Sequence, residues 1–506
     1  MVGGVCSLLR EPAFANSPIV PDRYPLDNRA NVFAFPAADD AVRTIPHTYS
    51  PFPPPMMPFA PCSPLYVHLQ LLICRIARPS GICYIHQVIG GSLSKLPPYH
   101  NSPFSERDSE AMTLSIQPAD RLATLPEQFF AALVVKANAR IALGRDVINL
   151  GQGNPDLPTP PHIVEALQQA AANPAYHKYP PFRGYPFLKE AVAKRYSEDY
   201  GVTLDPTQEV AILFGGKTGL VEISQCLLNP GDVCLVPDPG YPDYWSGVAL
   251  AEAEMAFMPL KRDNAFLPDY RQLAPDAVRR AKLMFLNYPN NPTAATATSA
   301  FYEETVAFAR QNGIVVASDF AYGAIGYDGR RPISFLETPG AREVGVEFYT
   351  ASKTYNMAGW RVGFALGNAQ IIEMLNLIQD HYYCSLFGGI QEAAAAALTG
   401  SQQPVKDLVA EYERRRDTLY DALARIGWHA DKPAGSFFCW LPVPEGYTSM
   451  SFADLLLEEA DVVVAPGNGF GASGEGYVRL GLLAQEARLV EAAERIGKLG
   501  LFSREN

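Results

Sequence analysis

The chain has 506 residues, of which 48% are hydrophobic and 19% charged, enough to bury one or more large cores. Its formal net charge is −12 at pH 7 without a basic cluster, which argues against nucleic acid or an anionic membrane surface as the main partner. The eight cysteines show no CxxC pair and no metal-ligand spacing with histidine, so we expect reduced thiols, no bound metal and small-molecule ligands.

Residues 1–111 differ in composition from the rest of the chain. They hold 17 of the 44 prolines and show no lasting helical or alternating pattern. We therefore expect a disordered or poorly ordered leader, with Met112 as a candidate natural start. A basic region followed by a continuous apolar segment is missing, and the most apolar stretch, 65–77, is too short to cross a bilayer. We expect a cytoplasmic protein without a membrane anchor.

From residue 147 onward, short apolar runs rich in branched residues alternate with helical patterns. Strands are predicted at 209–214, 233–237, 282–286, 314–317, 347–349 and 361–366. Helices are predicted to begin near residues 159, 185, 218, 299 and 369. This alternation indicates an α/β fold in which a mostly parallel sheet carries helices on both faces. Ligands of such sheets bind beyond the carboxyl ends of the strands.

Past residue 388 the pattern changes to long helices followed by short strands. Helices are predicted at 393–398 and 405–426, and strands at 437–441, 462–465 and 477–482. Ser451 with Asp454 is typical of a capping box that opens one more helix. These elements indicate a second, smaller α+β domain.

The expected organisation has four parts. Residues 1–111 form the leader, 112–155 an N-terminal arm with part of the small domain, 156–390 the large cofactor-binding domain, and 391–506 the small domain.

The most distinctive motif is TASKTYNMAGWR at residues 350–361, which places Lys353 among hydroxyls and Arg361 eight residues later. A lysine amine bonds covalently to an aldehyde only when it can lose its proton, which a partly desolvated, cationic neighbourhood favours. Arg361 would supply that charge and could also hold a dianionic phosphate. Because Ser-Lys-Thr is also common on solvated loops, the motif alone leaves a surface loop as an equal alternative.

Polar residues follow two other predicted strands. Asp319 comes after the strand at 314–317 and is either a helix cap or a carboxylate that keeps a pyridine nitrogen protonated. Tyr322, three residues later, could donate a hydrogen bond to the phenolic oxygen of the same ring. Asn291 lies in an Asn-Pro turn after the strand at 282–286 and is a candidate for that oxygen too.

Four further residues are candidates for ligand contacts. Gly215 and Gly216 join a strand to a helix whose first amides could bind an anion, and the absence of GxGxxG and GxxxxGK[ST] favours a single phosphate. Tyr241 is either a platform for an aromatic ring or an ordinary half-buried tyrosine. Arg479, among apolar strand residues, needs an anionic partner, which is either a substrate carboxylate or an internal salt bridge.

Together these motifs resemble the class I/II, fold-type I, pyridoxal-phosphate-dependent aminotransferases over nearly all of residues 112–506. The resemblance implies that Lys353 bonds to the cofactor, that Asp319 pairs with its pyridine nitrogen, and that both act in catalysis with Tyr322. It implies cofactor contacts from the following residues: Gly215, Gly216, Lys217, Tyr241, Asn291, Asp319, Tyr322, Thr350, Ser352, Lys353 and Arg361.

The resemblance also implies substrate and subunit contacts. Gly153, in GQGNPD at 151–156, would approach the substrate carboxylate together with Asn291 and Arg479. Tyr179 matches a tyrosine that reaches the phosphate of the neighbouring subunit, which implies a homodimer with shared active sites.

A closer likeness is to bacterial aminotransferases of methionine salvage, which convert 4-methylthio-2-oxobutanoate to methionine with glutamine as amino donor. Ala294 and Ser318 depart from the usual glycine and histidine of the family, but neither change removes a reacting group. LL-diaminopimelate aminotransferases share several of these motifs. The alternative is therefore an LL-diaminopimelate aminotransferase or a broad-specificity amino acid aminotransferase. A pyridoxal-phosphate-dependent C–S lyase on the same fold is a less favoured one.

Overall fold

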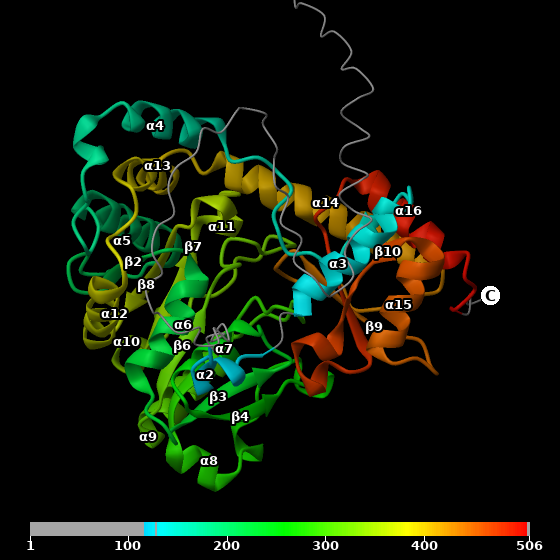
Figure 1. Cartoon of the computed structure of the whole chain (residues 1–506), viewed down its shortest axis with the longest axis horizontal. Helices are drawn as coiled ribbons and strands as arrows, with labels where there is room; N and C mark the ends of the chain where they lie inside the picture. Colours follow the sequence, from blue (N-terminus) through cyan, green and yellow to red (C-terminus); the bar gives the residue numbers. More distant parts are fainter. Residues whose placement is uncertain (1–115, 127–128, 503–506) are drawn as a thin grey trace, which may run out of the picture. The chain divides into compact units, whose positions relative to one another are not determined.

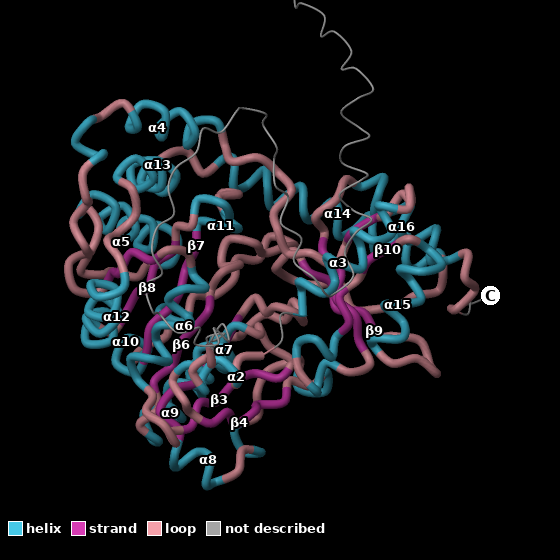
Figure 2. The backbone as a smooth tube through the Cα atoms, in the orientation of Figure 1, coloured by secondary structure: helices cyan, strands magenta, loops and turns pink. Residues whose placement is uncertain are grey.

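The computed structural model describes residues 116–126 and 129–502, and the predicted leader at 1–111 lies outside this part of the chain. Two groups of strands are visible within it, each with its own helices (Figures 1 and 2). Within the same residues, no helix is both long and apolar enough to cross a membrane.

The larger sheet has seven strands. In spatial order they are β2 (Val210–Leu213), β8 (Gly363–Gly367), β7 (Gly345–Thr350), β6 (Val315–Asp319), β5 (Ala281–Asn287), β3 (Val233–Asp238) and β4 (Glu254–Pro259). Neighbouring strands are parallel except that β8 runs antiparallel to both β2 and β7. The predicted α/β fold with a mostly parallel sheet is therefore confirmed.

Helices cover both faces of this sheet (Figure 1). Successive strand residues point to opposite faces, so Ile212 and Met284 enter one core while Leu213 and Phe285 enter the other. The first core is closed by α4 (Pro161–Ala171), α5 (Pro186–Tyr200), α9 (Ser299–Asn312) and α13 (Gly388–Thr399). The second is closed by α6 (Gly216–Leu227), α7 (Asp243–Leu250) and α12 (Ala369–Tyr382).

The smaller sheet is antiparallel and has the order β11 (Ala465–Pro466), β12 (Tyr477–Gly481) and β9 (Phe438–Pro442). Beside it, β1 (Ile148–Asn149) pairs in parallel with β10 (Val462–Val463). The helices of this region are α3 (Phe129–Ala142), α14 (Gln403–Arg425), α15 (Ser449–Ala460) and α16 (Glu486–Gly497). The expected domain boundaries stay a prediction.

Short helices connect these elements. The α-helical turns are α2 (Asp120–Ala123), α8 (Pro275–Arg280), α10 (Ala341–Val344) and α11 (Ala351–Thr354). The 3-10 turns are Pro174–His177, Arg262–Asn264, Tyr270–Gln272, Phe335–Glu337, Ala358–Trp360, Gly467–Phe470 and Ala472–Gly474.

The structure corrects two predicted boundaries. The capping box of α15 is formed by Thr448, whose hydroxyl accepts from Ser451 N at 3.1 Å, so the helix begins before Ser451 and the predicted box with Asp454 is wrong. The strand predicted from residue 361 begins at Gly363, because Arg361 has a φ of 60° in the left-handed region.

Candidate active site

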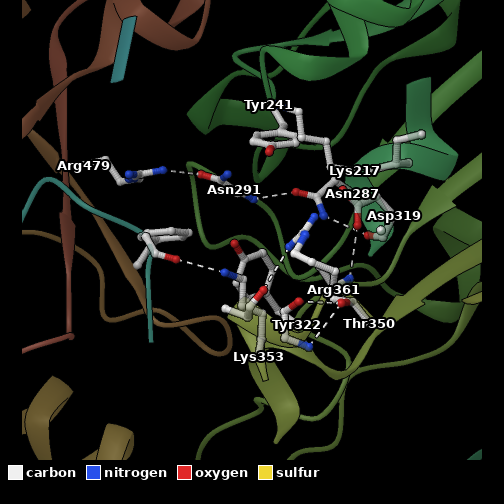
Figure 3. A pocket seen from close by; sticks show the side chains of 17 residues that line it. Lys217, Tyr241, Asn287, Asn291, Asp319, Tyr322, Thr350, Lys353, Arg361 and Arg479 are labelled. Atoms are coloured by element: carbon white, nitrogen blue, oxygen red, sulfur yellow. Dashed lines mark hydrogen bonds between the residues drawn. The ribbon is translucent and has the colours of Figure 1, made fainter. Parts of the chain in front are cut away.

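One cavity of about 310 Å³ lies at the carboxyl ends of β3, β5, β6 and β7 and gathers most of the predicted site residues (Figure 3). The predicted residues that line it are Gly153, Gly216, Lys217, Tyr241, Asn291, Asp319, Tyr322, Thr350, Ser352, Lys353, Arg361 and Arg479. Gly215 and Tyr179 are the two predicted residues that do not line it. The location agrees with the general position of ligand sites in open α/β sheets.

Lys353 lies on α11, directly after β7, and its side chain points into the cavity (Figure 3). Its Nζ donates a hydrogen bond to Gly153 O at 2.9 Å. Burial is the main cause that lowers the pKa of Lys353 to about 8, and the charges of Arg479 and Arg361 add to it. Lys353 is thus a cavity residue whose amine loses its proton far more readily than an exposed lysine, and the surface-loop alternative is wrong.

Asp319 is the last residue of β6 and is 7% exposed. The Tyr244 hydroxyl donates to Oδ2 at 2.6 Å, and the Ala321 amide donates to Oδ1 at 3.2 Å. Burial raises the pKa of Asp319 to about 6, although these hydrogen bonds oppose the shift. Turns rather than a helix follow at residues 321–324, so the helix-cap alternative is wrong.

A cradle of hydrogen-bond donors that could bind an anion lies where β2 meets α6. Gly215 has a φ of 81°, and a Cβ placed on it would lie 2.6 Å from Arg361 Nη2. The helix begins at Gly216, so its first amides, its dipole and the Arg361 guanidinium face the same region. The hydroxyls of Thr350 and Ser352 also belong to this cradle, and Thr350 Oγ1 donates to Ser352 Oγ at 2.8 Å. The cradle has the donors that a phosphate dianion requires.

Lys217 contributes to this cradle differently from Arg361. Its Nζ forms an ion pair with Asp243 Oδ1 at 2.9 Å, and its side chain is 50% exposed. The backbone amide of Lys217 in the first turn of α6 remains available to an anion.

Arg479 lies on β12 and is 1% exposed. Its Nη1 donates to Asn291 Oδ1 at 2.7 Å and its Nη2 donates to Gly151 O at 2.8 Å. The guanidinium lies 4.0 Å from the centroid of the Phe438 ring. Burial lowers the pKa of Arg479 to about 9, so a carboxylate that enters the cavity would stabilise its charged form.

The cavity contains residues that the sequence motifs did not single out. Asn287, at the end of β5, donates from Nδ2 to Asp319 O at 2.8 Å and accepts at Oδ1 from Asn291 N at 2.7 Å. It therefore links two predicted site residues (Figure 3). Its sequence signal is the same as that of Asp319, a polar residue that ends an apolar strand. The remaining unpredicted lining residues are Leu220, Ala321, Ala358 and Phe438.

The fold and this site define an aminotransferase. The chain belongs to the family of class I and II aminotransferases, whose profile matches residues 145–496. Enzymes of this family depend on pyridoxal 5′-phosphate. The predicted family and reaction class are confirmed.

Several individual proteins are similar to this chain over most of their length. The chain is 63% identical over 385 residues to L-glutamine–4-(methylsulfanyl)-2-oxobutanoate aminotransferase of Bacillus subtilis, covering 76% of this chain and 97% of the relative. It is 47% identical over 384 residues to LL-diaminopimelate aminotransferase of Moorella thermoacetica, covering 76% and 98%. The substrate-bound structure of BacF from B. subtilis superimposes with a TM-score of 0.75 at 49% identity, covering 78% of this chain and 100% of that one.

Proposed function

We propose that this chain binds pyridoxal 5′-phosphate in the cavity around Lys353 and transfers an amino group from glutamine to 4-methylthio-2-oxobutanoate. The observation that carries the cofactor assignment is the convergence of Lys353, Asp319 and the cradle at Arg361 on one cavity. The substrate assignment is supported by the relative from B. subtilis at 63% identity, which acts on the same oxo acid under its methylsulfanyl name.

The residues present fit this cofactor at three points. Burial raises the pKa of the Asp319 carboxyl to about 6. A protonated ring nitrogen beside it would favour the charged carboxylate, because opposite charges attract. Gly215, directly before α6, leaves room for the Arg361 guanidinium next to a phosphate. The Lys353 amine, with its pKa lowered to about 8, is able to attack an aldehyde.

When bound, pyridoxal phosphate supplies an aldehyde carbon that amines can bond to and a ring that accepts the electron pair released at the substrate Cα. In the proposed mechanism, Lys353 Nζ would take the proton from the substrate Cα and hold it inside the cavity. Asp319 would favour the protonated form of the ring nitrogen, and Tyr322 with Asn291 would bind the ring oxygen. Tyr241 would pack against the ring.

Substrate orientation is assigned to the side of the cavity that carries Arg479. Its guanidinium would hold the carboxylate in two parallel hydrogen bonds, with Asn291 and the backbone at Gly153 beside it. A fixed carboxylate fixes the direction of the Cα–H bond toward Lys353. The deep burial of Arg479 excludes water from that contact.

A half-reaction screen tests the substrate. The holoenzyme is mixed with single amino acids, and the absorbance of the cofactor is followed as it takes up the amino group. We expect fast reactions with glutamine and methionine and none with LL-diaminopimelate. The reverse pattern would establish the diaminopimelate alternative. Release of pyruvate and ammonia from a cysteine conjugate without an acceptor would establish the C–S lyase.

We also infer that the protein forms a homodimer with shared active sites. We infer that it is located in the cytoplasm. Tyr179 is 88% exposed, and Leu377 and Tyr382 on α12 are each 55% exposed. Contiguous exposed apolar patches are typical of protein interfaces, and Leu377 and Tyr382 lie on the same helix. A second subunit that covers them would give Tyr179 a partner site to contact.

A further inference from the structure

Two consecutive arginines, Arg415 and Arg416, are buried in the middle of α14, and each is 2% exposed. A buried guanidinium is costly unless charged and polar partners compensate it. Both have such partners, but the two side chains bind different parts of the chain.

Arg415 binds the segment that precedes α4. Its Nη1 lies 2.9 Å from both carboxylate oxygens of Asp156 and donates to Leu482 O at 3.0 Å. Its Nε donates to Glu411 Oε1 at 2.8 Å on the same helix. One guanidinium thus joins α14 to Asp156 and to the residue that follows β12.

The segment held by Asp156, residues 151–156, contains no helix or strand and contributes its backbone to the active site. Gly151 O accepts from Arg479 Nη2 at 2.8 Å, and Gly153 O accepts from Lys353 Nζ at 2.9 Å. Its N-terminal end is tied to the smaller sheet, since Leu150 O accepts from Gly481 N at 2.7 Å. At its other end, the Asp156 carboxylate is bound by Arg415.

We propose that Arg415 is a positioning residue for the substrate carboxylate. By binding Asp156 and Leu482 O together, it sets the position of residues 151–156 relative to β12, and so the position of Gly153 relative to Arg479. The inference rests on the proposed function in one respect, that the carboxylate binds between these two residues.

Arg416 provides a matched control on the same helix. Its Nη1 and Nη2 bind the two oxygens of Asp328 at 2.9 and 2.8 Å, and Nη1 donates to Pro433 O at 3.1 Å. Asp328 and Pro433 do not line the active-site cavity. A lysine at either position keeps the charge, but its single amine cannot reproduce the contacts that the guanidinium nitrogens make with several partners at once.

The test measures the affinity of the holoenzyme for 4-(methylthio)butanoate, a carboxylate with neither amino nor oxo group, by calorimetry. We expect Arg415→Lys and Asp156→Asn each to raise its Kd by about tenfold or more, because small displacements of positioning groups are this costly. The double variant should be no weaker than the worse single one, since both remove the same contact. Arg416→Lys should lower the unfolding midpoint about as much as Arg415→Lys does. Its Kd for the analogue should nevertheless stay within about twofold of the wild-type value.

Three outcomes would overturn the inference. An unchanged Kd in both Arg415→Lys and Asp156→Asn would show that the contact does not position the carboxylate. An equal loss of affinity in Arg416→Lys would show that buried arginines on α14 act only through stability. Equal affinity of wild type and Arg479→Lys for the analogue would overturn the proposed carboxylate site and this inference with it.

Discussion

At the scale of the residue, the proton on Lys353 is controlled mainly by burial. The sequence motif suggested that Arg361 would provide the cationic neighbourhood, whereas in the structure desolvation has the largest effect and Arg479 the next. Arg479 is far away in sequence and belongs to the smaller sheet. The proton affinity of Lys353 therefore depends in part on a charge that the smaller sheet contributes.

We predict that Lys353→Ala abolishes covalent attachment of pyridoxal phosphate and lowers transamination by at least on the order of 10²- to 10⁴-fold, from lost proton transfer alone. Borohydride reduction followed by peptide mass spectrometry measures the attachment. In wild type, the rate of cofactor capture should rise with pH and level off above about 8, because the unprotonated amine is the nucleophile.

Lys217→Ala is the control for this experiment, because Lys217 also lines the cavity but is ion-paired with Asp243. It should keep the covalent attachment at residue 353. A borohydride-stable adduct in Lys353→Ala protein would contradict the assignment.

Several site residues could be predicted from sequence because a polar group at the end of an apolar strand is conspicuous. Asp319 and Asn291 end or follow strands of the larger sheet, Arg479 occupies a strand of the smaller one, and all three line the same cavity. Tyr244 could not be predicted in the same way. It is a fully buried tyrosine on an unpredicted helix, and its bond to Asp319 joins residues 75 positions apart in the chain.

At the scale of the element, the start of helix α6 depends on Gly215, the glycine that precedes it. Gly215 combines a φ of 81° with the close approach of Arg361, so two independent constraints exclude a larger residue. The sequence indicated the turn and the helix but not the close approach of Arg361 to Gly215. Arg361 lies in the connection between β7 and β8, far from Gly215 in the sequence.

We predict that Gly215→Ala weakens pyridoxal phosphate binding by on the order of tenfold, because the new Cβ displaces the guanidinium that would hold the phosphate. Fluorescence titration of the cofactor-free protein measures this Kd. The control is Gly201→Ala at the end of α5, where φ is 67° but no atom lies within 4 Å of the added Cβ. It should cost about 1 kcal/mol of stability and leave the Kd unchanged. Equal Kd values for the two variants would refute the clash.

Elements with strong apolar patterns were predictable, whereas β4 and α7 were not. β4 is an edge strand in which only Met258 is buried, while Met255 and Phe257 are exposed. The apolar pattern of β4 in the sequence therefore does not indicate which of its residues face the core. α7 has only eight residues and follows Pro242 directly, which leaves little room for a helical period.

At the scale of the whole molecule, buried acids link folding to pH. Glu347 on β7 is fully buried and accepts hydrogen bonds from Ser334 Oγ at 2.6 Å, Phe335 N at 2.8 Å and Tyr196 OH at 3.1 Å. Burial nevertheless raises its pKa from 4.5 to about 7. The folded state thus binds a proton that the unfolded state releases between these values.

We predict that the cofactor-free protein loses stability as pH rises from 5 to 7, by up to about 1.4 kcal/mol per pH unit for each proton released. The contribution of Glu347 is present below the unfolded pKa and is lost as pH passes through the folded one. Urea unfolding at several pH values measures the slope. Glu347→Gln should flatten it, and an equal slope in the variant would contradict the role of this carboxyl.

A mixing experiment tests the shared active sites. Tyr179→Ala and Lys353→Ala subunits are unfolded together and refolded, and activity is measured at limiting cofactor. We expect recovery to about a quarter of wild type, because half of the random dimers are mixed and each has one complete site. A mixture of Lys353→Ala with Asp319→Ala should recover nothing, since both residues line the cavity of one subunit. No recovery in the first mixture would refute sharing.

The reversed direction of β8 has a further consequence. The parallel strands present their final residues at the edge where the cavity lies, whereas β8 presents its first residues there. The connection from β7 to β8, residues 351–362, can therefore be short and carries both Lys353 and Arg361 in one hairpin. Insertions into this hairpin would separate the proposed covalent anchor, Lys353, from the proposed phosphate contact, Arg361. Its length should therefore vary far less among functional variants than the lengths of loops at the opposite edge of the sheet.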